Sequence, residues 1–275
     1  MEMPLIVVRF RRIRLSICFR RLENIAGEEL MVREDWVVNK GVRLHYLDSN
    51  PEVCGLVPIV FVPGALASGE VYGTEIAALA PRRCIAVTLR GRGRSDAPET
   101  GYSFEDHVSD IEAIISELGL NRFCLMAYSM GVPFAIAYAS HHPQTLTGLI
   151  IADYPAGYPA LGPEWADQTL SVVPPRARPH VIRGLQRESA EVLLWDRLNP
   201  IECPVLILRG GRSGSLLTAE EAEMYRQRLR NVEVVVFEES GHELWKPDYN
   251  RFIGTIRGFL QQLDSQDASL RVNTP

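Results

Sequence analysis

A serine stands at a sharp break between two apolar segments. The run Phe123–Met126 predicts a short buried strand, and the residues after Gly131 are small and apolar in a helical pattern. Between them lies Ala-Tyr-Ser129-Met-Gly, and a strained strand-to-helix turn of this kind projects a serine hydroxyl out of a sheet. The pattern favours Ser129 as a nucleophile over an ordinary turn serine, with Ala127 at the position where glycine is usual.

The segments around Ser129 alternate between strand and helix patterns. Apolar or alternating runs predict strands at 35–39, 42–48, 57–62, 84–89, 123–126, 149–152, 205–208 and 232–237. Apolar spacing and capping residues predict helices at 70–80, 103–118, 131–141, 188–198, 219–229 and 249–263. The first two strands form a hairpin, and the later strands alternate with helices. The sequence therefore predicts an α/β fold with a mostly parallel sheet of about eight strands and helices on both faces.

The polar residues with chemical potential follow the ends of these strands. In such sheets ligands bind outside the carboxyl ends of the strands. The residues predicted at that edge are Pro63–Ala65, Ser129, Asp153, the loop 210–217 and Gly241-His242. We therefore expect them to form a single site.

The chain is predicted to divide into a main domain with two flanking segments. Residues 1–30 hold six arginines and four glutamates, and they are interpreted as a basic extension outside the fold, with a membrane-surface helix as the alternative. Residues 31–264 form the domain. Within it, the proline-rich stretch 154–199 interrupts the alternation and predicts a short lid over the site. Residues 265–275 are predicted to be a disordered tail.

Composition excludes several classes of protein. The net charge of −5 gives no basic surface for nucleic acid, and no apolar run is long enough to span a bilayer. The five cysteines are scattered and odd in number, which argues against disulfides and a zinc site and favours a reducing compartment such as the cytoplasm. No metal or other cofactor is predicted, and the oligomeric state is not readable.

Four segments together resemble the α/β-hydrolase fold family, over roughly residues 34–263. These segments are Phe61-Val-Pro-Gly-Ala, Leu89-Arg-Gly-Arg-Gly-Arg-Ser-Asp, Ala-Tyr-Ser129-Met-Gly and Glu239-Ser-Gly-His242. The resemblance implies the α/β-hydrolase fold with a lid insertion and a serine nucleophile. It says little about the substrate, because this fold carries many chemistries.

The resemblance also implies roles for individual residues. Ser129 would form an acyl-enzyme, and His242 would be the base that takes its proton. The backbone N–H groups of Ala65 and Met130 would form the oxyanion hole. Pro63 stands where the family commonly has histidine.

The acid of the implied triad has no carboxylate at its usual place. The loop 209–218 contains none, and the usual position falls on Ser213 or Gly214. Asp153 ends the neighbouring strand, where some members of this fold carry the acid. The alternative is that Asp153 only caps the strand or orders the lid entrance, and the sequence leaves both open.

Three arginines, Arg90, Arg92 and Arg94, lie on a glycine-containing loop at the predicted site edge. They either attract a carboxylate-bearing substrate or, as such loops more often do, serve the structure as solvated or paired side chains.

The function that we expect is a serine hydrolase that cleaves a small carboxylic ester, thioester or lactone. The apolar, proline-rich lid favours a modest hydrophobic acyl or alcohol part, so the expected partner is a small-molecule acyl substrate. One alternative is a non-hydrolytic or degenerate binding protein that has lost the acid. Another is a lyase or C–C hydrolase that uses the same Ser129 and His242.

Overall fold

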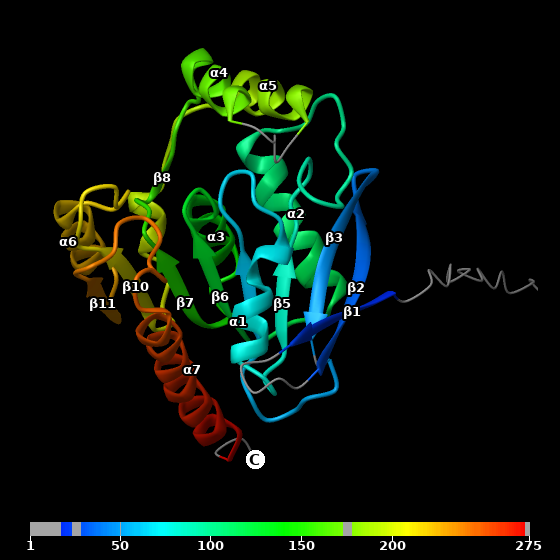
Figure 1. The fold of residues 1–275 in the computed structure, drawn as a ribbon. Coiled ribbons are helices and arrows are strands. Elements are labelled where there is room, and N and C mark those ends of the chain that lie inside the picture. Colours follow the sequence, from blue (N-terminus) through cyan, green and yellow to red (C-terminus); the bar gives the residue numbers. More distant parts are fainter. Residues whose placement is uncertain (1–17, 24–28, 50, 173–177, 273–275) are drawn as a thin grey trace, which may run out of the picture.

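A central twisted sheet organises the computed structural model, which describes residues 18–23, 29–49, 51–172 and 178–272 (Figure 1). Within these residues the sheet has nine strands in the order β1-β2-β3-β5-β4-β6-β7-β10-β11. The strands are β1 (Cys18–Glu23), β2 (Glu29–Asn39), β3 (Val42–Ser49), β4 (Ile59–Val62), β5 (Cys84–Val87), β6 (Phe123–Tyr128), β7 (Leu146–Ala152), β10 (Val205–Gly210) and β11 (Val232–Phe237). Eight of them correspond to the predicted strands.

The sheet is parallel from β5 to β11 and antiparallel at its other side. Strands β4, β5, β6, β7, β10 and β11 pair in parallel, while β3 pairs antiparallel with both β2 and β5. The carboxyl ends of the parallel strands therefore meet at one edge. This arrangement confirms the predicted mostly parallel sheet with an opening hairpin.

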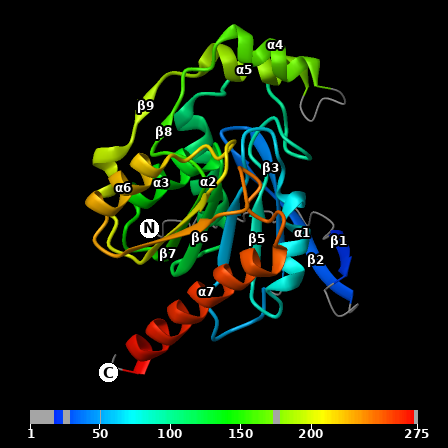
Figure 2. The same ribbon diagram turned by 60° about the vertical axis from the view of Figure 1, so that its left-hand side comes forward.

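Helices cover both faces of the sheet (Figure 2). They are α1 (Gly73–Ala78), α2 (Phe104–Glu117), α3 (Gly131–His141), α6 (Ala219–Arg228) and α7 (Tyr249–Val272). Side chains alternate along each strand, so Ile59 and Phe61 of β4 pack with α1 and α7, whereas Val60 and Val62 pack with α2 and α3. The two apolar layers hold the strand ends rigidly in place.

Capping boxes begin two of these helices. Ser103 accepts a hydrogen bond from the Asp106 N–H at the start of α2, and the Asp106 side chain accepts one from the Ser103 N–H. Thr218 and Glu221 make the same pair of contacts at the start of α6. Glu221 therefore has a structural role at the start of α6.

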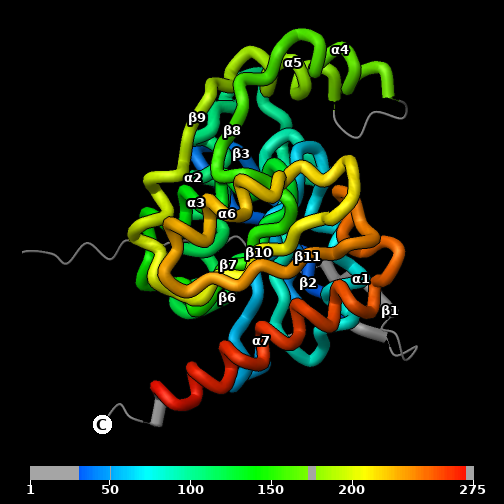
Figure 3. The backbone as a smooth tube through the Cα atoms, turned by 90° about the vertical axis from the view of Figure 1, so that its left-hand side faces the viewer, coloured from blue at the N-terminus to red at the C-terminus, as the bar shows by residue number. Residues whose placement is uncertain are grey.

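A lid rises above the carboxyl edge of the sheet on two short strands that pair antiparallel with each other (Figure 3). It consists of β8 (Gly157–Tyr158), α4 (Pro163–Ser171), α5 (Pro179–Glu188), β9 (Val192–Leu193) and a 3-10 turn at Trp195–Leu198. The Glu188 carboxylate fastens α5 to the body, because it accepts hydrogen bonds of 2.8 and 2.7 Å from the backbone N–H groups of Gly101 and Tyr102.

The predicted helix at 188–198 is wrong. The lid helices precede it, and β9 and the 3-10 turn occupy that range. Each lid helix begins at a proline, Pro163 or Pro179, a position where the missing N–H costs nothing.

Two predicted boundaries also differ from the structure. Residues 1–17 lie outside the described residues, but β1 pairs antiparallel with β2, so the sheet includes residues 18–23 of the predicted extension. At the other end, α7 continues to Val272, so the predicted tail is helical over 265–272. The buried Asp267 carboxylate accepts a 2.6 Å hydrogen bond from Arg122, which holds this part of α7 against the body although its apolar stripe ends at Leu263.

No helix among the described residues has the length and apolar character needed to cross a membrane.

Candidate active site

Ser129 lies on the tight turn between β6 and α3. Its backbone is in the left-handed region, with a φ of 55°, a conformation that residues other than glycine rarely adopt. Gly131 is required by space, because a Cβ at this position would lie 2.5 Å from the Pro63 carbonyl oxygen. Ala127, two residues before the serine, is completely buried. The turn therefore presents the serine at the carboxyl edge of the sheet, as the motif predicts.

The structure brings three of the predicted residues into one hydrogen-bonded chain. The Ser129 Oγ lies 3.0 Å from the Nε2 atom of His242. The Nδ1 atom of the same ring lies 2.8 Å from the Oδ2 atom of Asp153. The His242 side chain keeps 27% of its surface exposed, while Asp153 is completely buried. One end of the chain is therefore accessible and the other is shielded from water.

Asp153 is held by four donors, and it too has a left-handed backbone, with a φ of 52°. Its Oδ1 atom accepts hydrogen bonds from the Gly210 N–H and the Ser215 hydroxyl, and its Oδ2 atom accepts from the Leu216 N–H and from His242. Burial raises the pKa of Asp153, but the hydrogen bonds from His242, Ser215 and the two backbone N–H groups outweigh it, so the pKa is lowered. The carboxylate therefore stays ionised.

The ionised carboxylate fixes which nitrogen of the histidine carries the proton. A carboxylate can only accept, so the His242 Nδ1 atom is the donor toward Asp153. In the neutral ring, Nε2 is then the acceptor that faces the Ser129 hydroxyl. In this arrangement the imidazole can take the serine proton, and the neighbouring carboxylate stabilises the imidazolium that results.

The carboxylate-free loop 209–218 supports the acid instead of supplying it. Ser215 and the Leu216 N–H from this loop hold Asp153 in place. Tyr128 supports the histidine, since its ring stacks on the His242 ring with centroids 4.7 Å apart and its hydroxyl donates to the His242 carbonyl oxygen. The sequence analysis missed Tyr128, Ser215 and Leu216, and no local pattern marks them.

The predicted oxyanion donors lie beside the serine. Gly64 packs against Ser129, because a Cβ on this glycine would lie 3.0 Å from the Ser129 Cβ. Among the described residues, no acceptor is hydrogen-bonded to the backbone N–H of Ala65 or of Met130. Both groups therefore remain available to an oxygen on a ligand.

The arginine loop has the structural role that the sequence analysis weighed against substrate attraction. Arg90 is buried and forms an ion pair of 2.6 Å with buried Asp110, and Arg94 pairs with Glu34. Arg92 is completely buried and donates a 2.9 Å hydrogen bond from Nε to the Ala65 carbonyl oxygen. It therefore fixes the loop that carries one of the two free N–H groups. Burial lowers the pKa of Arg92 to about 10.

Arg92 also contacts His107, which burial and the arginine charge keep neutral. An arginine can only donate, so the His107 Nε2 atom accepts its hydrogen bond at 2.7 Å, and Nδ1 donates to the Ser103 carbonyl oxygen at 2.6 Å. Burial, and after it the neighbouring Arg92 charge, lower the pKa of His107 well below its usual range. A proton on His107 therefore opposes folding.

This pairing predicts a specific loss of stability in acid. As the pH falls below about 6.5, the unfolded chain binds a proton at this histidine before the folded chain does. His107 therefore lowers the free energy of unfolding by up to about 1.4 kcal/mol per pH unit, until the pH reaches the lowered pKa of His107 in the folded chain. We expect His107→Gln to flatten the decline in the free energy of unfolding, measured by urea denaturation between pH 7 and pH 5. The exposed His141→Gln serves as control. Equal pH slopes for wild type and His107→Gln would contradict this assignment.

The described residues contain no group of three or more His, Cys, Asp or Glu side chains placed to hold a metal ion.

Comparison with known proteins places the chain among hydrolases. The family model of the alpha/beta hydrolase fold matches residues 57–201. N-formylmaleamate deformylase of Pseudomonas putida is 25% identical over 80% of this chain and 93% of its own length. The AB hydrolase superfamily protein YisY of Bacillus subtilis is 27% identical over 78% of this chain and 98% of its own length. The crystal structure of the esterase RhEst1 from a Rhodococcus species superposes with a TM-score of 0.72 over 84% of this chain and 99% of that chain, at 22% identity.

Proposed function

We propose, on the premise that the chain belongs to the α/β-hydrolase fold family, that it is a serine hydrolase of small carboxylic esters, thioesters or lactones. Ser129 is the nucleophile, His242 is the general base and Asp153 is the acid of the triad. The observation that carries the proposal is the continuous hydrogen-bonded chain from the Ser129 Oγ through His242 to Asp153.

The proposed reaction uses each contact of this chain in turn. His242 takes the Ser129 proton as the hydroxyl oxygen attacks the substrate carbonyl carbon, and the N–H groups of Ala65 and Met130 stabilise the resulting oxyanion. The imidazolium then returns the proton to the leaving alcohol or thiol, and an acyl-enzyme remains on Ser129. Water, activated by the same histidine, hydrolyses the acyl-enzyme.

The position of Asp153 counts against a degenerate binding protein. That alternative rested on the missing carboxylate in the loop 209–218, and a buried, four-fold hydrogen-bonded aspartate now contacts the histidine from a neighbouring strand. A protein that had lost hydrolysis would have no need to keep this carboxylate ionised and aimed at His242.

Further observations support the substrate class and the cellular location. A relative named a deformylase and a structural neighbour named an esterase both fit the hydrolysis of small acyl compounds. The cysteines at positions 54, 84, 124 and 203 are free thiols, which fits a reducing compartment such as the cytoplasm.

Acyl-enzyme formation is the direct test of this function. We expect p-nitrophenyl acetate and p-nitrophenyl butyrate to give an initial burst of p-nitrophenol that is stoichiometric with enzyme, if deacylation is the slower step. In that case, mass spectrometry of acid-quenched samples should find the acyl group on the peptide that contains Ser129. A thioester and a γ-lactone of similar size then rank the leaving groups. Turnover with the acyl group on another residue, or no turnover of any of these compounds by folded protein, would contradict the proposal.

A further inference from the structure

A cavity lies behind the nucleophile turn, on the side of the sheet covered by α1 and α7. Its volume is about 330 Å³, within the range typical of small-molecule sites. Gly64 and Tyr128 form the wall nearest to Ser129, and residues of α1 and α7 form the opposite wall. Ser129 and His242 do not line it, so the chemistry proposed above leaves this cavity without a role.

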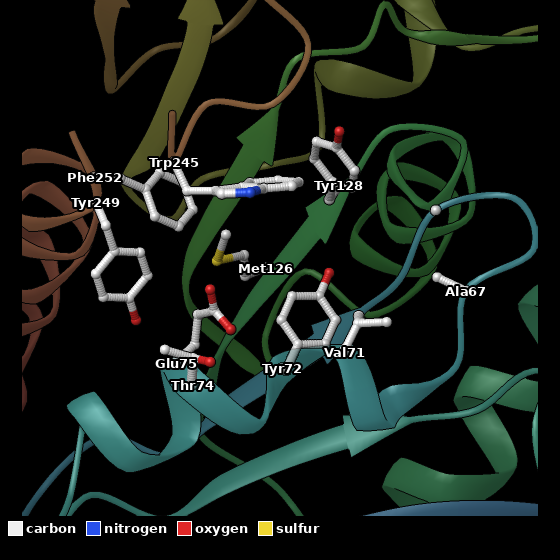
Figure 4. Close-up of a pocket in the computed structure, with 11 residues that line it drawn as sticks. Ala67, Val71, Tyr72, Thr74, Glu75, Met126, Tyr128, Trp245, Tyr249 and Phe252 are labelled. Atoms are coloured by element: carbon white, nitrogen blue, oxygen red, sulfur yellow. The ribbon is translucent and has the colours of Figure 1, made fainter. Parts of the chain in front are cut away.

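Glu75 places a carboxyl group in this cavity, whose other lining residues are mostly aromatic or aliphatic (Figure 4). The residue is only 9% exposed, and no Lys, Arg or His side chain among the described residues forms an ion pair with it. Burial raises the pKa of Glu75, because the ionised form loses its hydration. When it is ionised, the carboxylate has no cationic partner among the described residues, an arrangement that costs free energy unless a cation is supplied.

Aromatic rings surround the carboxyl group. Figure 4 shows the Trp245 indole edge-on across the cavity from Glu75, with the Met126 side chain drawn between them in this view and with Tyr72 and Tyr249 on either side. The Tyr249 hydroxyl is buried and has no hydrogen-bond partner among the described residues. Aromatic faces attract cations, and cages of such rings bind substituted ammonium groups.

We propose that this cavity binds a small ammonium compound, with the positive charge beside the Glu75 carboxylate and among the rings of Tyr72, Tyr249 and Trp245 that line the cavity. A hydroxyl group on the same molecule pairs with the Tyr249 hydroxyl. A neutral ligand of equal shape would leave the carboxylate unpaired, and an anion would be repelled by it. The site is distinct from the Ser129 centre and goes beyond the function proposed above.

The cavity is nevertheless connected to the active site through one ring. Tyr128 lines the cavity and stacks on the His242 ring. It also meets Trp245 edge-on, and the centroids of the Tyr128 and Trp245 rings are 5.3 Å apart. A bound ammonium compound would therefore rest against the residues that hold the histidine in place.

Choline and its uncharged carbon isostere, 3,3-dimethyl-1-butanol, give a matched test. Isothermal titration calorimetry on the full chain should show that choline binds at least about tenfold more tightly than the isostere, since a desolvated cation–π contact is added to a charge pair. We expect Glu75→Gln, which preserves the side-chain shape, to remove this preference while leaving the affinity for the isostere unchanged. Trp245→Leu should weaken both ligands. The exposed Glu105→Gln is the control and should bind choline as wild type does.

Three results would overturn the proposal. They are equal affinity for the two compounds, an undiminished preference for choline in folded Glu75→Gln, and no binding of choline by the folded wild type. Circular dichroism establishes folding in each case. None of these results depends on hydrolytic activity, and binding of choline should persist in Ser129→Ala, so failure here is distinguishable from failure of the proposed hydrolase.

Discussion

Replacing Ser129 with alanine is expected to lower kcat/KM for ester hydrolysis about a million-fold, because the nucleophile is lost and the histidine has no proton to accept. Neither alanine nor serine favours the left-handed backbone found at this position, so the substitution should add little backbone strain. The measurement is the steady-state rate with p-nitrophenyl butyrate.

The matched control for this change is Ser140→Ala, which removes a hydroxyl from α3 at a distance from the triad. This control should keep full activity, and both variants should melt within a few degrees of wild type. Retention of even one per cent of the activity in Ser129→Ala would exclude Ser129 as the nucleophile.

Changing Asp153 to asparagine is expected to lower kcat about ten-thousand-fold, as in the serine-protease example in which an asparagine imposes the wrong tautomer on the histidine. Both carboxylate oxygens of Asp153 accept hydrogen bonds from two donors each. An amide NH₂ in either place would therefore face N–H or O–H donors. Steady-state rates for both esters measure the effect.

Ser215→Ala provides a graded comparison with Asp153→Asn. It removes one of the four donors and leaves the carboxylate, so we expect a loss of about ten- to a hundred-fold, the size of a single hydrogen bond to a charged group. An Asp153→Asn variant with activity within tenfold of wild type would show that the histidine works without this acid. A larger loss in Ser215→Ala than in Asp153→Asn would also contradict the assignment.

Local sequence is sufficient to find Ser129 and His242. The serine lies between an apolar strand run and a small-residue helix, and the histidine follows the last strand in a Gly-His pair. Each of these surroundings is set by residues within a few positions along the chain. The structure places both side chains at the predicted edge of the sheet.

Local sequence leaves Asp153 undecided, because its contact with His242 depends on residues far apart in the chain. The left-handed backbone at Asp153 turns the carboxylate toward the histidine loop, and donors from Gly210 to Leu216 hold it there. A strand-end aspartate that only caps has the same sequence neighbours. The distinction appears only in three dimensions.

The errors in the fold have the same origin. The helix α7 continues past its apolar stripe because Arg82 and Arg122, more than a hundred residues earlier, pair with Asp264 and Asp267. Strand β1 joins the sheet through backbone pairing with β2, which needs no apolar pattern at a sheet edge. The spacing of apolar residues indicates only which face of one element is buried. It therefore misses segments that ion pairs or backbone hydrogen bonds hold in place.

The rate of labelling by a fluorophosphonate probe tests most directly whether Ser129 is an activated nucleophile and whether Asp153, at the end of β7, is its acid. The reaction needs only the nucleophile and its base, and it requires no knowledge of the substrate. We predict rapid labelling at Ser129, located by peptide mass, none in Ser129→Ala, and labelling slowed by several orders of magnitude in Asp153→Asn but much less in Ser215→Ala. Rapid labelling that is indifferent to Asp153→Asn would contradict the assigned acid, and no labelling of the folded wild type would contradict the hydrolase itself.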